Sequence, residues 1–356
     1  MNIEKYELDK RVPKDFYASY SALRIKCNTV WEVAKRENNY AMYKPYLKDM
    51  IEATKKYYRY MYPNTNLYDG MLNSYESGMT SSVIDRLFAE LKEAILPIVR
   101  KLSKEEIAKP YLQKYSSSTL LDTAEYLLDY IGFDMKRGAL GIYPHGFTEK
   151  MNKDDIRIAF KSGDNPIDFV STIIHEGGHG IFEQQMSSEL GVIQNACIEE
   201  CYALHESQSR FYENILGRNI NFWKPIYSDI KEKLNLELTL EEFVQELNSA
   251  HPSLIRTEAD ELTYCFHIII RYEIERALFN DNIDVDDLPT IWNNKMKEYL
   301  GIEVPNDTVG IMQDVHWSEG SFGYFPSYLL GSIYDGMFIE SIERDLGNID
   351  EILAEG

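Results

Sequence analysis

The sequence lacks long apolar runs and carries little positive charge. No stretch of about eighteen or more apolar residues occurs, so no membrane-spanning helix is expected. The first residues, 1–6, hold no apolar signal-peptide core, and the expected location is the cytoplasm. Lysine and arginine number 37 against 58 aspartates and glutamates, a net charge of −21. This excess of negative charge argues against nucleic acid or an anionic membrane surface as a partner.

Cysteine is scarce as well. The four cysteines are Cys27, Cys197, Cys201 and Cys265, and none forms a CxxC pair. Cys197 and Cys201 are four residues apart, so on a helix they would share a face and could bind a metal. Burial as small apolar residues in a reducing compartment is the favoured alternative.

Flexible linkers, internal repeats and low-complexity tracts are absent from the sequence. A chain of 356 residues is long enough to bury a large core. We therefore expect a single domain over residues 1–356.

The most informative segment is HEGGH at residues 175–179, an HExxH motif. On a helix, His175 and His179 would stack on one face and could reach one metal ion. Glu176 would point away from that pair, close enough to touch a water on the metal without binding the metal itself. Two ligands, an open position and a general base are what a zinc peptidase needs.

Two further features favour this interpretation over a helix with two surface histidines. The preceding residues 167–174 are mostly apolar, as in a buried helix. The two glycines inside the motif each cost about 1 kcal/mol of helix stability relative to alanine. Such a cost indicates that substrate or a packed neighbour must approach the backbone closely.

Apolar spacing predicts helices over most of the chain. One helix is expected to start at Thr80 or Ser81, and the pattern at residues 103–106 is a capping box that would open another. A loop is expected from Pro63 to Gly70. The other expected helices cover residues 14–60, 118–131, 195–216, 222–234, 239–249, 257–280, 288–300 and 325–346.

Residues 132–165 are the exception, because glycine and proline interrupt them. Residues 155–160 alternate between polar and apolar with period two, as a strand does. We predict a small antiparallel sheet directly before the motif helix. Its edge strand could bind an extended peptide by backbone pairing, and a purely structural hairpin is an equally favoured alternative.

A catalytic zinc usually takes a third protein ligand. The candidates lie in residues 199–208, on a separate expected helix. Glu206 and its neighbour His205 would point about 100° apart around that helix, so both are not expected to bind equally. The residues alone leave these two close, with Glu199 and Glu200 behind them.

Four ordered blocks carry a family resemblance. They are HEGGH at 175–179, HESQ at 205–208, IRTEAD at 255–260 and GIMQDVHW at 310–317. These blocks resemble the HExxH, HESQ, IRxxAD and GxxQDxHW signatures of the M32 metallocarboxypeptidases, the Taq carboxypeptidase type. Further similarity follows over residues 320–328, and the resemblance runs from near residue 12 to the C-terminus.

The resemblance implies a metal held by His175, His179 and Glu206, with Glu176 as the general base that activates the water. It implies a carboxypeptidase that removes single residues from a free peptide C-terminus. The implied fold is mainly α: a helical saddle with a deep groove and a small antiparallel sheet beside the HExxH helix. Zinc is the implied metal, often with higher activity on cobalt, and the implied assembly is a homodimer.

A carboxypeptidase must recognise a free carboxylate, which arginine can bind with two parallel hydrogen bonds. Arg256 is the first candidate, given the resemblance. The alternative is an ion pair with Glu258 or Asp260, or a charge at the C-terminus of a helix. Two weaker candidates for the same task are Arg271 and, on the expected edge strand, Arg157.

His316 and Tyr324 are the expected donors to the oxyanion or to the terminal carboxylate. Asp314 could orient His316, and both Asp314 and Gln208 are counted among the substrate-binding candidates. Tyr324 lies in a glycine-rich loop that could close over substrate, and an aromatic plug in the core is the alternative.

Other polar residues are expected around the site. Asp260 could accept the second N–H of a ligating histidine, and His205 is expected beside the ligands. The remaining histidines, His145, His251 and His267, are expected to be structural or exposed.

Two features depart from the family pattern. Usual members carry an additional helical segment at the N-terminus, which helps to wall the groove, and residues 1–20 resemble a join partway into that pattern. At residues 143–147 the sequence is YPHGF, whereas relatives usually have a proline directly before the phenylalanine. The backbone near the sheet is therefore expected to differ.

Two alternatives to the carboxypeptidase remain. A wider groove would suit an endo-acting zinc oligopeptidase, and a C-terminally amidated peptide would distinguish the two. A non-catalytic metal-binding or dimerising protein is the third hypothesis. The intact Glu176 weakens it, because a binding module has no use for a general base.

Overall fold

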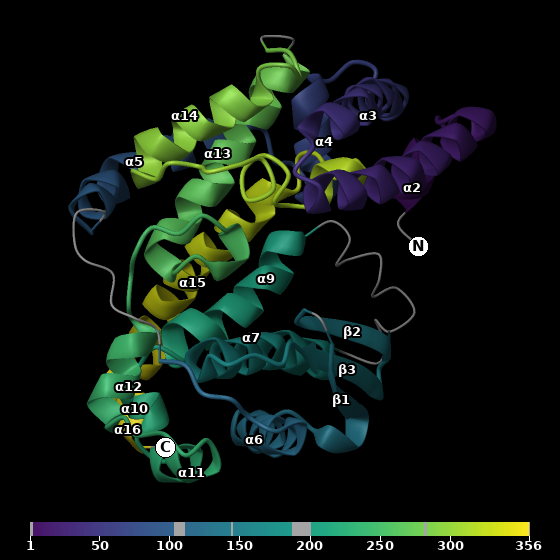
Figure 1. The fold of residues 1–356 in the computed structure, drawn as a ribbon. Coiled ribbons are helices and arrows are strands. Elements are labelled where there is room, and N and C mark those ends of the chain that lie inside the picture. The colour runs from purple at the N-terminus through teal and green to yellow at the C-terminus, as the bar shows by residue number, and fades with distance from the viewer. Residues whose placement is uncertain (1–2, 103–110, 144, 187–200, 281–282, 356) are drawn as a thin grey trace. The chain divides into compact units, whose positions relative to one another are not determined.

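The computed structural model describes residues 3–102, 111–143, 145–186, 201–280 and 283–355 (Figure 1). Within these ranges the chain is mostly helical with a small three-stranded sheet, as the sequence predicts. It divides into two compact units built from interleaved segments. Unit 1 comprises residues 1–106, 199–201 and 250–329, and unit 2 comprises residues 107–198, 202–249 and 330–356.

Some expectations fall outside the described residues. They concern the capping box at 103–106, the first part of the helix expected over 195–216, and Cys197, Glu199 and Glu200.

Unit 1 is helical throughout its described residues, apart from its connecting loops. Its helices are α1 (Ile3–Asp9), α2 (Lys14–Arg36), α3 (Tyr40–Met61), α4 (Leu67–Tyr75), α5 (Ser81–Leu102), α13 (Glu261–Phe279), α14 (Leu288–Leu300) and the first residues of α15 (Phe325–Leu346).

Two predictions in this part of the chain were wrong in detail. The helix expected over residues 14–60 is broken into α2 and α3, because Asn38 adopts the left-handed region with φ 51° and Asn39 caps α3. The loop expected from Pro63 to Gly70 ends early, because the Asn66 side chain accepts two backbone N–H bonds and starts α4 at Leu67.

Unit 2 combines helices with the sheet. Its elements are α6 (Ser117–Tyr130), β1 (Gly138–Ile142), β2 (Phe147–Asn152), β3 (Asp155–Phe160), α7 (Pro166–Gln185), α9 (Tyr202–Arg210), α10 (Ile220–Trp223), α11 (Tyr227–Lys233), α12 (Leu240–Leu247), the rest of α15 and α16 (Ile349–Glu355). A separate helix α16 and the division between α10 and α11 were not predicted.

The sheet has the order β1-β3-β2, with β3 in the middle. Its strands β2 and β3 form an antiparallel hairpin, but β1 runs parallel to β3, so the prediction of an antiparallel sheet was wrong. β1 and β2 follow each other in the sequence but lie on opposite sides of β3. Because β3 is paired on both sides, it is not the expected edge strand.

The core of unit 2 surrounds α7, which packs against β3, α6 and α9 (Figure 1). Val170, Ile173 and Ile174 of α7 are fully buried and belong to one apolar cluster with Leu127 and Phe160. This packing fixes the helix that carries the HExxH motif.

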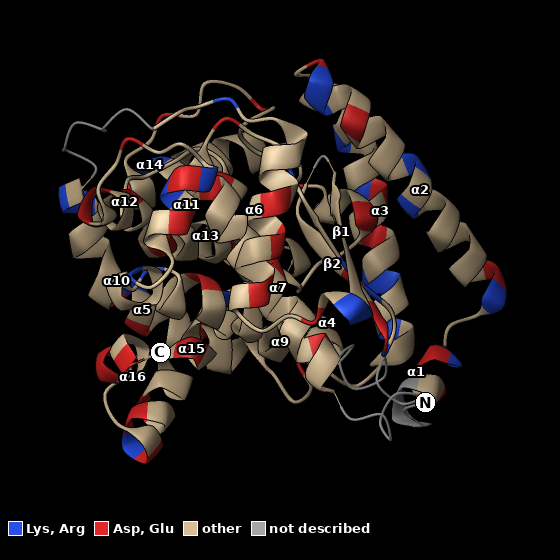
Figure 2. Cartoon of the chain, turned by 90° about the horizontal axis from the view of Figure 1, so that it is seen from below, with Lys and Arg blue, Asp and Glu red and all other residues tan. Residues whose placement is uncertain are grey.

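The surface agrees with the acidic composition. Both α6 and α16 carry aspartates and glutamates and no lysine or arginine, as Figure 2 shows.

Among the described residues, no helix combines the length and the apolar character needed to cross a lipid bilayer.

Candidate metal centre

The HExxH segment is helical. Asn165 caps the start of α7 by accepting from the backbone N–H of Ile167, and Pro166 occupies the first turn. The rings of His175 and His179 consequently lie on one face, with centroids 5.1 Å apart. The geometry expected from the i, i+4 spacing is therefore present.

The glycines of α7 are explained by packed neighbours rather than by open space. A Cβ on Gly178 would lie 2.8 Å from the backbone oxygen of Gln208 and 2.9 Å from Cα of Ser209, both on α9. A Cβ on Gly177 would collide with Ile131. Gly178 thus lets the backbone of α9 approach α7 directly.

This close approach brings Glu206 to the two histidines. One carboxylate oxygen, Oε2, lies 3.4 Å from Nε2 of His179 and 3.9 Å from Nε2 of His175. Donor atoms that sit about 2.1 Å from a tetrahedral zinc lie about 3.4 Å from one another. The three side chains therefore fit a divalent metal, and the donor set of two imidazoles and a carboxylate is one that zinc accepts.

His205, the alternative to Glu206, takes a different position. Its ring stacks on His179 with centroids 4.3 Å apart, and its Nε2 lies 3.2 Å from Glu183. Glu183 also pairs with Lys150 of β2 at 2.8 Å. His205 thus lies beside the metal-ligand candidate His179, as expected, and packs against the His179 ring.

Burial and charge set the protonation of the three candidates. Burial alone would raise the pKa of Glu206, but the neighbouring histidines lower it to about 2. Burial lowers the pKa of His179 to about 4. Burial would also lower the pKa of His175, but Glu213 and Glu206 outweigh this and raise it to about 9. An anionic carboxylate and a neutral imidazole are the forms that bind a metal. Glu206 and His179 are in these forms near neutral pH, whereas His175 must release its proton when a metal binds.

Glu176 is buried next to these residues and is held by β2. Its Oε2 accepts a 2.7 Å hydrogen bond from the Thr148 hydroxyl, which also donates to the Glu176 carbonyl at 3.0 Å. Burial raises the pKa of Glu176. Gly146 lies beside the other oxygen, because a Cβ there would be 3.0 Å from Oε1. The glycine found where relatives usually have proline thus lies against this carboxylate.

The carboxylate on the outer nitrogen of a ligand candidate is Glu213, not Asp260. Glu213 Oε2 lies 2.8 Å from Nδ1 of His175 and 3.2 Å from Arg210. Asp260 instead caps α13 by accepting from the backbone N–H groups of Leu262 and Thr263. The expected contact of Asp260 with a ligating histidine stays a prediction.

Two residues of this site were missed from the sequence, Thr148 and Glu213. A signal for Glu213 existed, because it follows Glu206 by seven residues, about two helical turns, and so shares its side of a continuous helix. The observed segment 211–216 is a π-helical turn, a rare feature that is frequent at functional sites. No sequence signal indicated Thr148.

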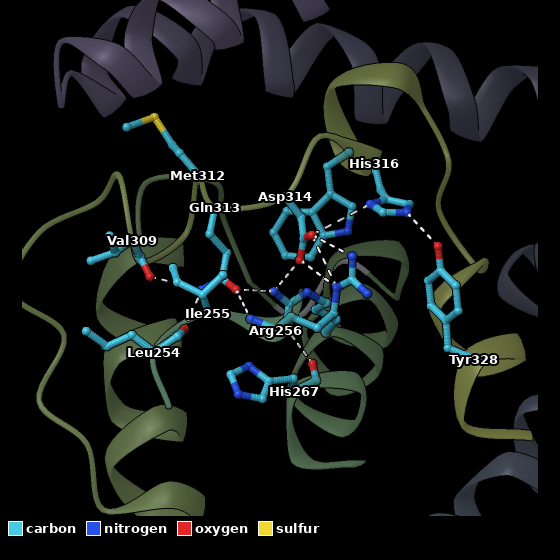
Figure 3. A network of polar contacts seen from close by, with 12 residues as sticks. Leu254, Ile255, Arg256, His267, Val309, Met312, Gln313, Asp314, His316 and Tyr328 are labelled. Carbon is cyan, nitrogen blue, oxygen red and sulfur yellow. Dashed lines mark hydrogen bonds and ion pairs between the residues drawn. The ribbon is translucent and has the colours of Figure 1, made fainter. Parts of the chain in front are cut away.

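The residues of the IRTEAD and GIMQDVHW blocks form a second group, within unit 1 (Figure 3). Arg256, in the short 3₁₀ helix η3 (Arg256–Glu258), is buried and binds Asp314 through two nitrogens. Arg271 of α13 contacts the other oxygen of Asp314. The carboxamide oxygen of Gln313 accepts from both the Arg256 backbone N–H and Arg271. The ion pair of Arg256 is thus with Asp314, and not with Glu258 or Asp260.

His316 and Tyr324 lie together in the same unit. Their rings stack with centroids 5.6 Å apart, and Tyr324 also packs on Tyr75 at 5.1 Å. The hydrogen-bond partner of His316 Nε2 is the Tyr328 hydroxyl at 3.3 Å, whereas Asp314 lies 4.0 Å from Nδ1. Tyr328, rather than Asp314, therefore holds the imidazole.

Two other substrate-binding candidates, Arg157 and Gln208, make hydrogen bonds to residues close to them in the sequence. Arg157 is exposed on the central strand β3 and pairs with Asp155 through two hydrogen bonds. Gln208, partly buried on α9, donates to the Ser207 hydroxyl at 3.3 Å. Their contact with substrate stays a prediction.

Comparison with known proteins assigns the family. The family model described as carboxypeptidase Taq (M32) metallopeptidase matches residues 1–356. Carboxypeptidase 1 of Bacillus subtilis is 40% identical over 362 residues, which span 99% of this chain and 72% of that protein. The thermostable carboxypeptidase 1 of Thermus thermophilus is 32% identical over 99% of this chain and 72% of its own length.

Solved structures agree with these matches. Metallocarboxypeptidase 1 of Trypanosoma cruzi superimposes with a TM-score of 0.90 at 30% identity, covering 97% of this chain and 71% of that one. The M32 carboxypeptidase of Deinococcus radiodurans gives a TM-score of 0.89 at 27% identity, over 97% and 70% of the two chains. The chain therefore belongs to the M32 family of metallopeptidases and is a metallocarboxypeptidase, a hydrolase that acts on peptides.

Proposed function

We propose that this chain removes single amino acids from the free C-terminus of peptides, with His175, His179 and Glu206 holding the metal and Glu176 acting as the general base. The observation that supports this most is the convergence of three donor atoms, all within 4.8 Å of one another, beside a buried carboxylate. A divalent metal bound there supplies Lewis acidity, which acidifies water and polarises a carbonyl group.

Glu176 is suited to move the proton. Its carboxylate is fixed by Thr148, and its raised pKa makes it a better proton acceptor than an exposed glutamate. In the proposed reaction, Glu176 takes the proton of the attacking water and then delivers it to the leaving amine. Glu213 holds His175 in the ring orientation that directs Nε2 to the site.

Recognition of the terminal carboxylate is assigned to Arg256 in this proposal. Arg256 and Arg271 both pair with Asp314, so these three side chains together carry one net positive charge. The excess charge favours an additional carboxylate. It also favours neutral imidazoles: burial, assisted by the two arginines, lowers the pKa of His316 to about 3. Neutral His316 and Tyr324 remain able to donate hydrogen bonds to an oxyanion.

Mass spectrometry of a peptide with a free C-terminus tests the proposal. The peptide is incubated with the protein and zinc, cobalt or a chelator, beside the same peptide with an amidated C-terminus. We expect a metal-dependent ladder of C-terminal losses from the free peptide and none from the amidated one. Internal cuts in both peptides would instead identify an endo-acting oligopeptidase.

Glu176→Gln tests the role of the base. We expect it to retain the metal, because Glu176 is not a ligand, and to lose about 10²- to 10⁴-fold in kcat. Glu149→Gln, which changes an exposed carboxyl on β2, is the matched control and should cleave normally. Unchanged cleavage by Glu176→Gln would contradict the mechanism.

Zinc as the native metal, a homodimeric assembly and a cytoplasmic location stay predictions from the sequence and its family resemblance.

A further inference from the structure

One buried carboxylate lies outside both groups of residues described above. Glu275 of α13 is fully buried in unit 1 and accepts three hydrogen bonds. The indole Nε1 of Trp317 donates to Oε1 at 2.7 Å, and the backbone N–H of Gly323 donates to Oε2 at 2.8 Å. The Tyr68 hydroxyl of α4 also donates to Oε2, at 2.8 Å.

Two of these donors mark the ends of one loop. Trp317 and Gly323 enclose residues 318–322, and the residues directly outside them are His316 and Tyr324. The two carboxylate oxygens therefore each hold one end of the loop. Their spacing is fixed by the covalent geometry of the carboxylate, so the two ends are held at a set separation.

The packing of the loop leaves it little freedom at its second end. Gly323 has φ +83°, and a Cβ there would lie 2.8 Å from Met71 Cβ and 3.0 Å from the Met71 backbone carbon. The buried Phe322 ring stacks on Trp317 at 6.2 Å and meets Phe279 of α13 at 4.9 Å. Contacts with α4 and α13 thus enclose the loop that Glu275 holds.

We propose that Glu275 is a positioning residue that clamps the 317–323 loop and thereby sets the stacked pair His316 and Tyr324. This inference rests on the proposed function, which assigns catalytic donation to that pair. If Glu275 served only to stabilise the fold, the loss of any one of its three hydrogen bonds would have a similar effect. The clamp instead depends on the bonds from Trp317 and Gly323 and not on the bond from Tyr68.

Chemistry distinguishes these bonds. An indole N–H and a backbone N–H can only donate, so each needs an acceptor oxygen. The carboxamide in Glu275→Gln has one oxygen and one NH₂ group. Its NH₂ group therefore faces the N–H of either Trp317 or Gly323, and that hydrogen bond is lost. Burial raises the pKa of Glu275 to about 7, and the donors act against that rise. Measurements are therefore made at pH 8, where the carboxylate is ionised.

The experiment compares Glu275→Gln with Tyr68→Phe. Both variants lose a buried hydrogen bond, but Tyr68→Phe leaves both bonds to the loop in place. Each variant is assayed for kcat and KM on the free-C-terminus peptide, for its melting temperature, and for the indole N–H signals of the four tryptophans by NMR. Trp317→Phe assigns the relevant signal and removes one end of the clamp if Glu275→Gln fails to fold.

We expect Glu275→Gln and Trp317→Phe to lower kcat at least tenfold with a smaller change in KM. The Trp317 indole signal should move in Glu275→Gln. We expect Tyr68→Phe to stay within about twofold of the wild-type kcat despite a lower melting temperature. Equal loss of kcat in Tyr68→Phe and Glu275→Gln, or an unchanged kcat in Glu275→Gln, would overturn the clamp.

The two proposals fail differently. If the wild type releases no C-terminal residue, the proposed function is wrong. The indole N–H signals alone then test whether Glu275 positions the 317–323 loop. A Trp317 signal that moves in Glu275→Gln and not in Tyr68→Phe then supports it, and a signal that stays in place overturns it.

Discussion

His267 lies fully buried on α13 beside the arginines of unit 1, and its carbonyl accepts a 2.7 Å hydrogen bond from Arg271 (Figure 3). Burial, together with Arg271 and Arg256, lowers the pKa of this imidazole to about 3, although Asp314 acts in the opposite direction. The sequence predicts a structural or exposed role for His267. Its complete burial next to two cations makes it a titrating group with a measurable effect on stability.

We expect His267 to make the protein less stable as the pH falls from about 6.5 toward 3. The unfolded chain binds a proton near its ordinary pKa of about 6.5, whereas the folded chain does not until about pH 3, so acid favours unfolding. Within this window the group contributes about 1.4 kcal/mol of lost stability per pH unit. Denaturant unfolding at pH 7, 6 and 5 measures the slope.

His267→Phe should reduce the pH dependence of the unfolding free energy by about 1.4 kcal/mol per pH unit, the contribution of one proton. This should hold even if the variant is less stable at pH 7. His145→Gln, which removes an exposed histidine, is measured beside it as the control. An identical slope in wild type and His267→Phe would show that His267 titrates alike in the folded and unfolded states.

At the scale of single residues, the sequence indicated which residues form the candidate site better than it indicated their hydrogen-bond partners. Residue type and i, i+4 spacing were enough to nominate His175, His179 and Glu176, since a helix fixes which side chains share a face. Choosing Glu206 needed the family resemblance. The carboxylate that meets His175 was missed, although the seven-residue spacing from Glu206 pointed to Glu213, which contacts the imidazole from a π-helical turn.

At the scale of elements, the contact between α7 and α9 sets the geometry of the candidate metal centre. Gly178 permits this contact, since any larger residue would meet the α9 backbone within 2.9 Å. Glu206 is carried by α9, so the separation of the two helices sets its distance from His175 and His179. The glycines were correctly interpreted as places of close approach.

We expect Gly178→Ala to weaken metal binding at least tenfold, because it must push α9 and therefore Glu206 away from the histidines. Isothermal titration of the metal-free protein with zinc measures the affinity. Alanine favours helix more than glycine does, so a local propensity effect would work in the opposite direction.

Gly163→Ala serves as the matched control for that variant. No atom lies within 4 Å of a Cβ placed on Gly163, so we expect unchanged affinity. Equal zinc affinity in Gly178→Ala and wild type would mean that the two helices can separate without moving Glu206.

Element types were easier to predict than their connections. The strand 155–160 and the helix 288–300 were placed within their observed bounds. The order β1-β3-β2 could not be derived, because the alternation of polar and apolar residues marks a strand and does not say which strands pair. Breaks at single asparagines, such as Asn38, were missed because the apolar spacing continues past them.

At the scale of the whole molecule, the ligand candidates cross-link segments far apart in the chain. His175 lies on α7, and Glu206 lies on α9, beyond residues 187–200. A metal that binds only the folded site stabilises it by mass action, about 2.7 kcal/mol at one hundred times the dissociation constant. Folding and metal binding should therefore be coupled.

Calorimetry should show a higher melting temperature with zinc or cobalt and a lower one after chelation. Glu206→Gln should lose most of this difference, because the site loses an anionic ligand. A melting temperature that responds to metal equally in wild type and Glu206→Gln would place the stabilising ion elsewhere.

The division into two units had no signal in the sequence, and a single domain over residues 1–356 stays a prediction. Both units are assembled from segments that are separated in the sequence. Composition and periodicity report on neighbours along the chain and not on segments that return after a hundred residues or more.

The bond between Tyr68 and Glu275 joins residues separated by 207 positions in the chain. During synthesis at about 5 to 20 residues per second, α4 therefore leaves the ribosome roughly 10 to 40 s before its buried partner exists. During that interval most residues of unit 2 are synthesised, whereas the core of unit 1 stays incomplete until residues 250–329 follow. We expect this early segment to be the part of the nascent chain that most needs protection by chaperones.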